Sequence, residues 1–224
     1  MIFDLPVFTF ARKISIEERQ AIAATLRKGD ILLTSDKLFP AWQWAVGFLG
    51  SPRFSHAAIY EGKSNVIEAT TFHPSGDGVA RTGVDEFLAG RKNVCVLRPK
   101  LPSKQHKDNM FAWLLKQIGK PYDFNFNNHD DHTMYCAKLV GRAITTAGLN
   151  IPTKCIAGHD LYFPDDFMQS EKMRIVYHKP ETAIHKLMNN LPLLLVPVLW
   201  ITGIAPLWVL VLILLAAGWI QLKT

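Results

Sequence analysis

Cys136 is the residue of this 224-residue chain that is best placed for nucleophilic chemistry. The sequence from Thr133 to Ala147 is typical of a helix, and Gly148 is a suitable residue to end it. With Thr133 as N-cap, Cys136 would lie three residues into the helix, where free backbone N–H groups and the helix dipole stabilise a thiolate. Most intracellular cysteines are buried and inert, so a nucleophile is predicted only if a base lies beside it.

His56 is the candidate base, because residues 55–60 are a predicted strand in which imidazole is an unusual side chain. Residues 66–70 follow after a short turn and complete a β-hairpin signal. Pairing the apolar residues of the two strands requires an odd-length loop centred on Lys63 and places His56 and Glu68 together on the other face. A carboxylate in that position orients a catalytic base and stabilises its charged form. The alternative is a surface ion pair of little energetic value.

The other elements predict an α+β domain in which a small antiparallel sheet packs against helices. Ser15 and Glu18 have the spacing of a capping box, which begins a packing helix that runs to about Arg27. The glycine-rich, polar residues 74–90 carry no predicted element. Further strands are expected at residues 31–33, 93–98 and 174–178, and further helices at residues 40–49 and 103–118.

The C-terminal residues 191–222 contain no Asp, Glu, Lys, Arg or His and are rich in Leu, Val, Ile and Trp. This stretch exceeds the roughly 20 residues that cross a bilayer, so it predicts one tilted transmembrane helix, with a buried core helix as the alternative. The N-terminal sequence lacks the pattern of a secretory signal, and basic residues precede the tail. We therefore expect a single-pass membrane protein with its globular domain on the cytoplasmic side.

Charge and composition disfavour several classes of partner and cofactor. The formal net charge of +6 suits a domain beside anionic lipid, but no basic cluster is dense enough to predict nucleic-acid binding. Three scattered cysteines do not make a disulfide framework or a paired zinc site. The run from His129 to His132 contains ligand-type residues, yet adjacent residues rarely converge on one ion. We expect no metal and no cofactor, and the oligomeric state stays open.

Five motifs occur in a telling order: GDILLT, FSHAAIY, VIEA, GKPYDFNF and YCAKLV. Together they resemble the circularly permuted branch of the NlpC-type papain-like cysteine hydrolases, especially the YiiX-like group, over about residues 29–148. The resemblance implies a helix with the nucleophile at its N-terminus, packed against a small antiparallel sheet that carries the base. It also implies Cys136 as nucleophile, His56 as base and Glu68 as the residue that orients the base.

This resemblance implies a membrane-anchored hydrolase that cleaves an amide bond of a peptide or isopeptide through a thioester on Cys136. The lecithin retinol acyltransferase-like proteins are a more distant resemblance, and they suggest a lipid acyl ester as the alternative substrate. Their Asn-Cys-Glu context is replaced here by Tyr-Cys-Ala. A non-catalytic, membrane-anchored binding module is the alternative of another class.

Tyr122, Tyr135 and Ser55 are candidates for the substrate pocket or the oxyanion hole, although ordinary packing is the alternative for each tyrosine. The backbone N–H of Cys136 is the preferred second oxyanion donor. The expected domain boundaries are residues 1–28 for an N-terminal extension with a packing helix, 29–180 for the permuted papain-like domain, 181–190 for a linker and 191–222 for the membrane segment.

Overall fold

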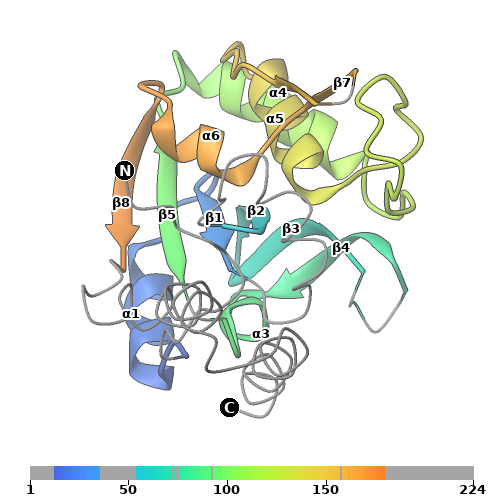
Figure 1. Ribbon diagram of the computed structural model, residues 1–224. Coiled ribbons are helices and arrows are strands. Elements are labelled where there is room, and N and C mark those ends of the chain that lie inside the picture. Colours follow the sequence, from blue (N-terminus) through green and yellow to red (C-terminus); the bar gives the residue numbers. More distant parts are fainter. Residues whose placement is uncertain are drawn as a thin grey trace, which may run out of the picture. The chain divides into compact units, whose positions relative to one another are not determined.

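An antiparallel sheet lies at the centre of the part of the chain that the computed structural model describes, which is residues 13–35, 54–71, 73, 76–91, 93–156 and 158–179 (Figure 1). In chain order the elements are α1 (Ile16–Thr25), β1 (Ile31–Thr34), β2 (His56–Gly62), β3 (Asn65–Thr70), β4 (Gly78–Gly83), α3 (Val84–Leu88), β5 (Val94–Pro99), α4 (Lys104–Leu115), α5 (Cys136–Thr146), β6 (Lys154–Ile156), β7 (His159–Leu161), α6 (Pro164–Gln169) and β8 (Met173–His178).

The main sheet has the strand order β4-β3-β2-β1-β5-β8, and each neighbouring pair is antiparallel. Strands β6 and β7 form a separate two-stranded hairpin. Helices α4, α5 and α6 pack on one face of the sheet, and α1 and α3 pack on the other. The α+β class with an antiparallel sheet, which the sequence predicts, is confirmed.

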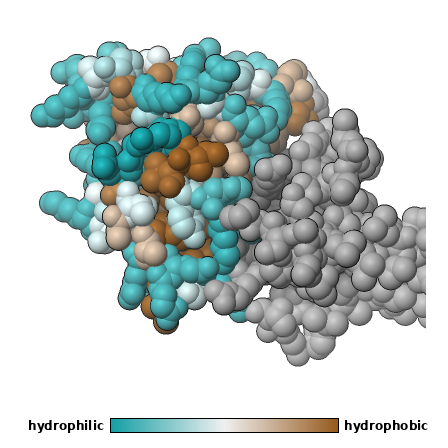
Figure 2. All heavy atoms as spheres, turned by 90° about the vertical axis from the view of Figure 1, so that its left-hand side faces the viewer, coloured by the Kyte–Doolittle hydropathy of each residue, from teal (hydrophilic) through white to brown (hydrophobic). Residues whose placement is uncertain are grey.

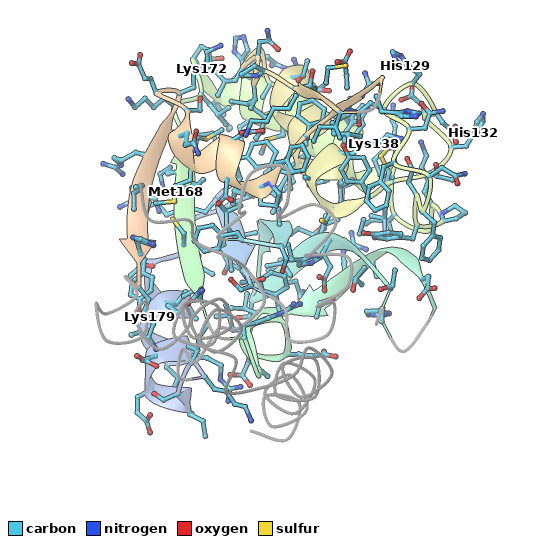
Figure 3. The ribbon with its side chains drawn as sticks, in the orientation of Figure 1. His129, His132, Lys138, Met168, Lys172 and Lys179 are labelled. Carbon is cyan, nitrogen blue, oxygen red and sulfur yellow. The ribbon has the colours of Figure 1, made fainter. Side chains whose placement is uncertain are left out.

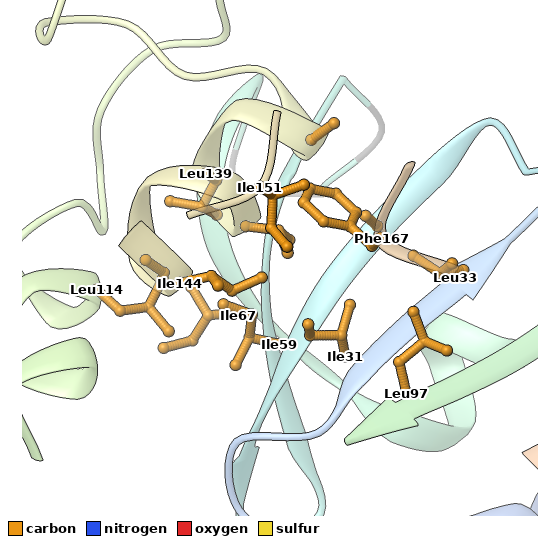
Figure 4. Close-up of a cluster of buried hydrophobic side chains, with 14 of the residues drawn as sticks. Ile31, Leu33, Ile59, Ile67, Leu97, Leu114, Leu139, Ile144, Ile151 and Phe167 are labelled. Carbon is orange, nitrogen blue, oxygen red and sulfur yellow. The ribbon is translucent and has the colours of Figure 1, made fainter. Parts of the chain in front are cut away.

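Both faces of the central strands are buried, and this explains why β1 is a continuous apolar run. Ile31 and Leu33 face α4 and α5, whereas Leu32 between them faces α1 and α3. Figure 4 shows the larger of the two cores, in which sheet residues meet helix residues such as Leu139 and Ile144. Among the described strands, β8 lies at one edge of the sheet. The described surface on this side faces the viewer in Figure 2 and is largely hydrophilic around a small hydrophobic patch.

The predicted capping box of α1 is confirmed. The Ser15 hydroxyl accepts a hydrogen bond from the Glu18 N–H at 3.2 Å, and the Glu18 carboxylate accepts one from the Ser15 N–H at 2.8 Å. The helix ends at Thr25, two residues before the predicted end, because Leu26 already has an extended backbone conformation. This segment leads directly into the turn before β1.

The hairpin of β2 and β3 has the predicted pairing of Ile59 with Ile67. The predicted odd-length loop is wrong. Lys63 and Ser64, both with positive φ, form a two-residue turn, and a bulge between Tyr60 and Gly62 takes up the extra residue. The bulge restores the register of the rest of the hairpin, so His56 still lies on the face predicted for it.

Two further parts of the sequence-based interpretation differ from the structure. Residues 74–90 include strand β4 and helix α3, which were not predicted. The sequence carries no strand signal for β4 because it is a short edge strand of mixed polarity with a glycine at each end. Helix α5 begins at Cys136 with Tyr135 as N-cap, and not at Thr133. The reason is that Met134 pairs with Tyr122 as an isolated β-bridge, which keeps the chain extended up to Tyr135.

The predicted helix at residues 40–49 and the predicted membrane segment at residues 191–222 lie outside the described residues. Within the described residues, no helix is both long enough and apolar enough to cross a bilayer. The predicted domain boundaries stay predictions.

Candidate active site

Strands β2, β3 and β4 bring three polar side chains together in a buried place. The His56 Nε2 lies 2.5 Å from the Glu68 Oε2, and the Thr82 hydroxyl donates to the Glu68 Oε1 at 2.5 Å. The three residues are between 3% and 6% exposed. Cross-strand register explains the chain of contacts, because Glu68 pairs with Ala58 and Ala80, which places His56 and Thr82 at the diagonal positions two residues away.

Cys136 is the first residue of α5, and its Sγ lies 3.9 Å from the carbonyl oxygen of Ser55, the residue before His56. The Cys136 thiol and the His56 ring lie close enough for each group to shift the pKa of the other. Since Nε2 of the ring binds Glu68, Nδ1 is the nitrogen that remains for the thiol. The structure thus brings the predicted nucleophile, base and orienting residue into one chain of contacts.

The Cys136 thiol and the His56 imidazole shift each other's pKa in the directions that favour an ion pair. Burial lowers the pKa of His56, but hydrogen bonds and charges from Cys136 and Glu68 outweigh it and raise the pKa from 6.5 to about 10. Burial raises the pKa of Cys136, but the hydrogen bond and charge of His56 and the backbone N–H groups of Ala57 and Ala137 bring it below its ordinary value. The arrangement favours a thiolate beside an imidazolium.

Helix α3 packs an aromatic side chain against the imidazole of His56. The Phe87 ring lies 5.7 Å from the His56 ring, centroid to centroid. Arg91 donates from its Nε to the Phe87 carbonyl at 3.0 Å and lies over the Phe87 ring at 5.3 Å. Burial lowers the Arg91 pKa to about 10, and the charge of Cys136 opposes this. Phe87 and Arg91, neither of which the sequence pointed to, therefore contribute to the environment of Cys136 and His56.

Lys138 organises the loop that leads to Cys136. Its side chain is fully buried, and Nζ binds the Asp123 carboxylate at 3.1 Å and the carbonyl oxygens of Asn127, Asp130 and Thr133. Figure 3 shows Lys138 on α5 beside the loop that carries His129 and His132. Lys138, two residues after Cys136, thus binds four points of the loop that precedes Cys136. These contacts explain why a lysine is tolerated inside the core.

We expect Lys138→Met to lower the free energy of unfolding by about 3 kcal/mol or more, because the buried Asp123 carboxylate would lose its cation. Adding Asp123→Asn should recover part of this loss, since the double variant leaves no buried charge unpaired. Denaturant unfolding measures both effects. Lys116→Met, at an exposed position, is the control and should change stability little. A Lys138→Met variant as stable as this control would contradict the assignment.

The three further site candidates lie in different surroundings. Ser55 contributes its backbone carbonyl near the thiol, as described above. The Tyr135 hydroxyl donates to the Asn128 side chain at 3.0 Å and accepts from the Tyr162 N–H at 2.9 Å, so it holds the loop in place. Tyr122 pairs with Met134, two residues before Cys136, and burial and then the charge of Cys136 raise the pKa of its phenol. Tyr122 is therefore the better candidate to line the site.

The residues of the suspected metal motif serve the loop itself. The Asp130 carboxylate accepts hydrogen bonds from the His132 N–H at 2.8 Å and the Thr133 hydroxyl at 2.9 Å. These bonds and then the charge of Lys138 lower the Asp130 pKa, although slight burial opposes them. Among the described residues, no group of three or more His, Cys, Asp or Glu side chains is placed to hold a metal ion.

Three comparisons place this geometry among known proteins. A family model described as "Permuted papain-like amidase enzyme, YaeF/YiiX, C92 family" matches residues 25–186. The crystal structure of the metalloprotein yiiX from Escherichia coli O157:H7 superposes with a TM-score of 0.57 at 17% identity, over 70% of this chain and 99% of that chain. Protein OPG091 of Variola virus is 27% identical over 125 residues, which is 54% of this chain and 70% of that protein.

Proposed function

The chain belongs to the family of permuted papain-like amidases, which are cysteine hydrolases, and we propose that it cleaves an amide bond of a peptide or isopeptide through a thioester on Cys136. The observation that carries this proposal is the chain of contacts from Cys136 at the start of α5 through His56 to Glu68. A thiolate at a helix N-terminus beside an oriented imidazolium is the machinery of thiol-dependent acyl transfer.

In the proposed reaction the Cys136 thiolate attacks the carbonyl carbon, and the carbonyl oxygen becomes an oxyanion. The His56 imidazolium then gives its proton to the departing amine, the C–N bond breaks, and a thioester remains on Cys136. His56, now neutral, takes a proton from water as the water attacks the thioester. The acid product leaves, and the thiolate and imidazolium return to their starting state.

The backbone N–H of Cys136 is our first candidate for oxyanion stabilisation, because it is the first N–H of α5 and the oxyanion forms beside it. The Tyr122 hydroxyl is our candidate for the second donor. Its neighbour Phe124 is 64% exposed, and the two rings lie 5.0 Å apart. These two aromatic side chains would offer an apolar surface to the acyl part of a substrate.

This aromatic surface is the specific reason to keep a lipid acyl ester as the second candidate substrate. The uncharged residues 191–222 favour it too, because we propose that they anchor the enzyme to a bilayer, with the hydrolase domain on the cytoplasmic side. Both chemistries share the same thioester, so the active-site residues do not distinguish them. The substrate does.

Purified full-length protein should be incubated with a library of acyl-peptide amides and, separately, with labelled phospholipid, with Cys136→Ala as the control. We expect peptide cleavage by the wild type only, and an intact-mass increase on Cys136 equal to the acyl fragment of the cleaved peptide. Release of fatty acid without any peptide cleavage would overturn the amide proposal in favour of the lipid ester. Tyr122→Phe should slow either reaction if its hydroxyl is an oxyanion donor.

A further inference from the structure

A cavity of about 420 Å³ lies at the opposite end of the sheet from Cys136. Gly29 and Asp30 line it just before β1 begins, and Pro99 lines it where β5 ends. By contrast, His56 pairs with Thr34, at the far end of β1. The cavity is therefore separate from the candidate active site, and the proposed hydrolysis makes no use of it.

Basic side chains dominate the lining. Arg98 is already paired, because its Nε and one terminal nitrogen bind the two Asp30 oxygens at 2.7 Å each. Arg27, Lys28, Lys104 and Lys107 also line the cavity, and within the described residues none of these four has a carboxylate partner. Lys28 lies 4.3 Å above the Phe111 ring. Four cations around one hollow repel one another unless an anion joins them.

The backbone around these cations is held in place. The Gly29 N–H donates to the Tyr60 carbonyl at 2.9 Å, and the Arg27 N–H donates to the Asp30 carboxylate at 2.8 Å. Lys104 and Lys107 are one turn apart in the first part of α4, so they lie on the same side of that helix. The first turn of α4 carries no acidic residue.

We propose that this cavity binds a ligand bearing a phosphate group with two negative charges. Lysine and arginine together form strong, charge-assisted hydrogen bonds with phosphate oxygens, and the volume holds a phosphate with a small attached group. Such a group is found on phosphomonoester lipid headgroups and on soluble phosphorylated molecules. The two sources share this chemistry and differ only in what carries the phosphate.

The test uses the full-length protein in detergent and pyrophosphate as probe, with affinity measured by calorimetry at fixed salt. We expect Lys104→Glu/Lys107→Glu to weaken binding by about tenfold or more, because two charge-assisted contacts become repulsive. Lys13→Glu/Lys116→Glu makes the same change of net charge at exposed residues outside the lining, and it should change affinity by less than about twofold. If the first variant does not fold, Lys104→Gln/Lys107→Gln replaces it.

A second arm identifies the source of the phosphate. Vesicles of phosphatidylcholine with or without phosphatidic acid are offered to the wild type and to both double variants. A preference for phosphatidic acid that only Lys104→Glu/Lys107→Glu loses supports a lipid headgroup, whereas pyrophosphate binding without that preference supports a soluble ligand. Failure to bind either probe, or an equal loss of binding in both double variants, would overturn the proposal.

Discussion

Cys136→Ala is expected to lower kcat/KM for the cleaved substrate by about four to six orders of magnitude, because no other group can form the thioester. Cys155→Ala is the matched control, since Cys155 is the exposed free thiol and lies on β6, and it should leave the rate unchanged. Steady-state hydrolysis measures both variants. A Cys136→Ala enzyme that keeps more than about one hundredth of the rate would show that the reaction uses another nucleophile.

Alkylation by iodoacetamide checks the same prediction without knowledge of the substrate. At pH 6 Cys136 should react before the two other thiols, because its thiolate is stabilised by His56 and by the backbone N–H groups of Ala57 and Ala137. Burial raises the pKa of Cys95 to about 12, so Cys95 should stay unlabelled. If Cys155 reacts as fast as Cys136, the thiol is not activated, and the non-catalytic binding module becomes the better interpretation.

The contact between His56 and Glu68 could be predicted because strand pairing has a strict period of two. Once Ile59 faces Ile67, the faces of all neighbouring residues follow, and the bulge at the turn changes only the loop. The position of Cys136 was predicted less precisely. Its helix starts later than expected, since the bridge between Met134 and Tyr122 overrides the local preference for an N-cap at Thr133.

Thr82 and Lys138 could not be predicted, for two different physical reasons. Thr82 acts from β4, an edge strand between two glycines whose sequence lacks the alternation that marks a half-buried strand. Lys138 is a cation on the buried face of α5, where sequence patterns lead one to expect an apolar residue. Its partners are mostly carbonyl groups of an irregular loop, and such contacts leave no periodic signal.

The opposite pKa shifts of Cys136 and His56 predict a wide pH range of activity. The lowered pKa of Cys136 lets the thiolate form at lower pH than in an ordinary cysteine, so activity should rise at a correspondingly lower pH. The imidazolium persists until the pH approaches about 10, the raised pKa of His56, and activity should then fall. The two limbs of the profile belong to the coupled pair rather than to either residue alone.

Glu68→Gln should narrow this range and lower kcat/KM at neutral pH by about two to four orders of magnitude. Burial lowers the pKa of His56, and without the carboxylate charge this effect is less opposed. The imidazolium then loses its proton at lower pH, so the alkaline limb of the profile moves to lower pH. With less imidazolium present, the Cys136 thiolate is less stabilised, and the acid limb moves to higher pH. The measurement is kcat/KM from pH 5 to about 10.5.

Thr82→Val is the control that distinguishes charge from position, because it removes one hydrogen bond to Glu68 and keeps the carboxylate. It should slow the reaction by about tenfold at most and leave both limbs near their wild-type positions. If Glu68→Gln lowers the rate equally at every pH without moving either limb, Glu68 only holds the His56 ring in place. Movement of both limbs toward each other would instead show that the buried carboxylate sets the charge of the ring, and through it the charge of the thiol.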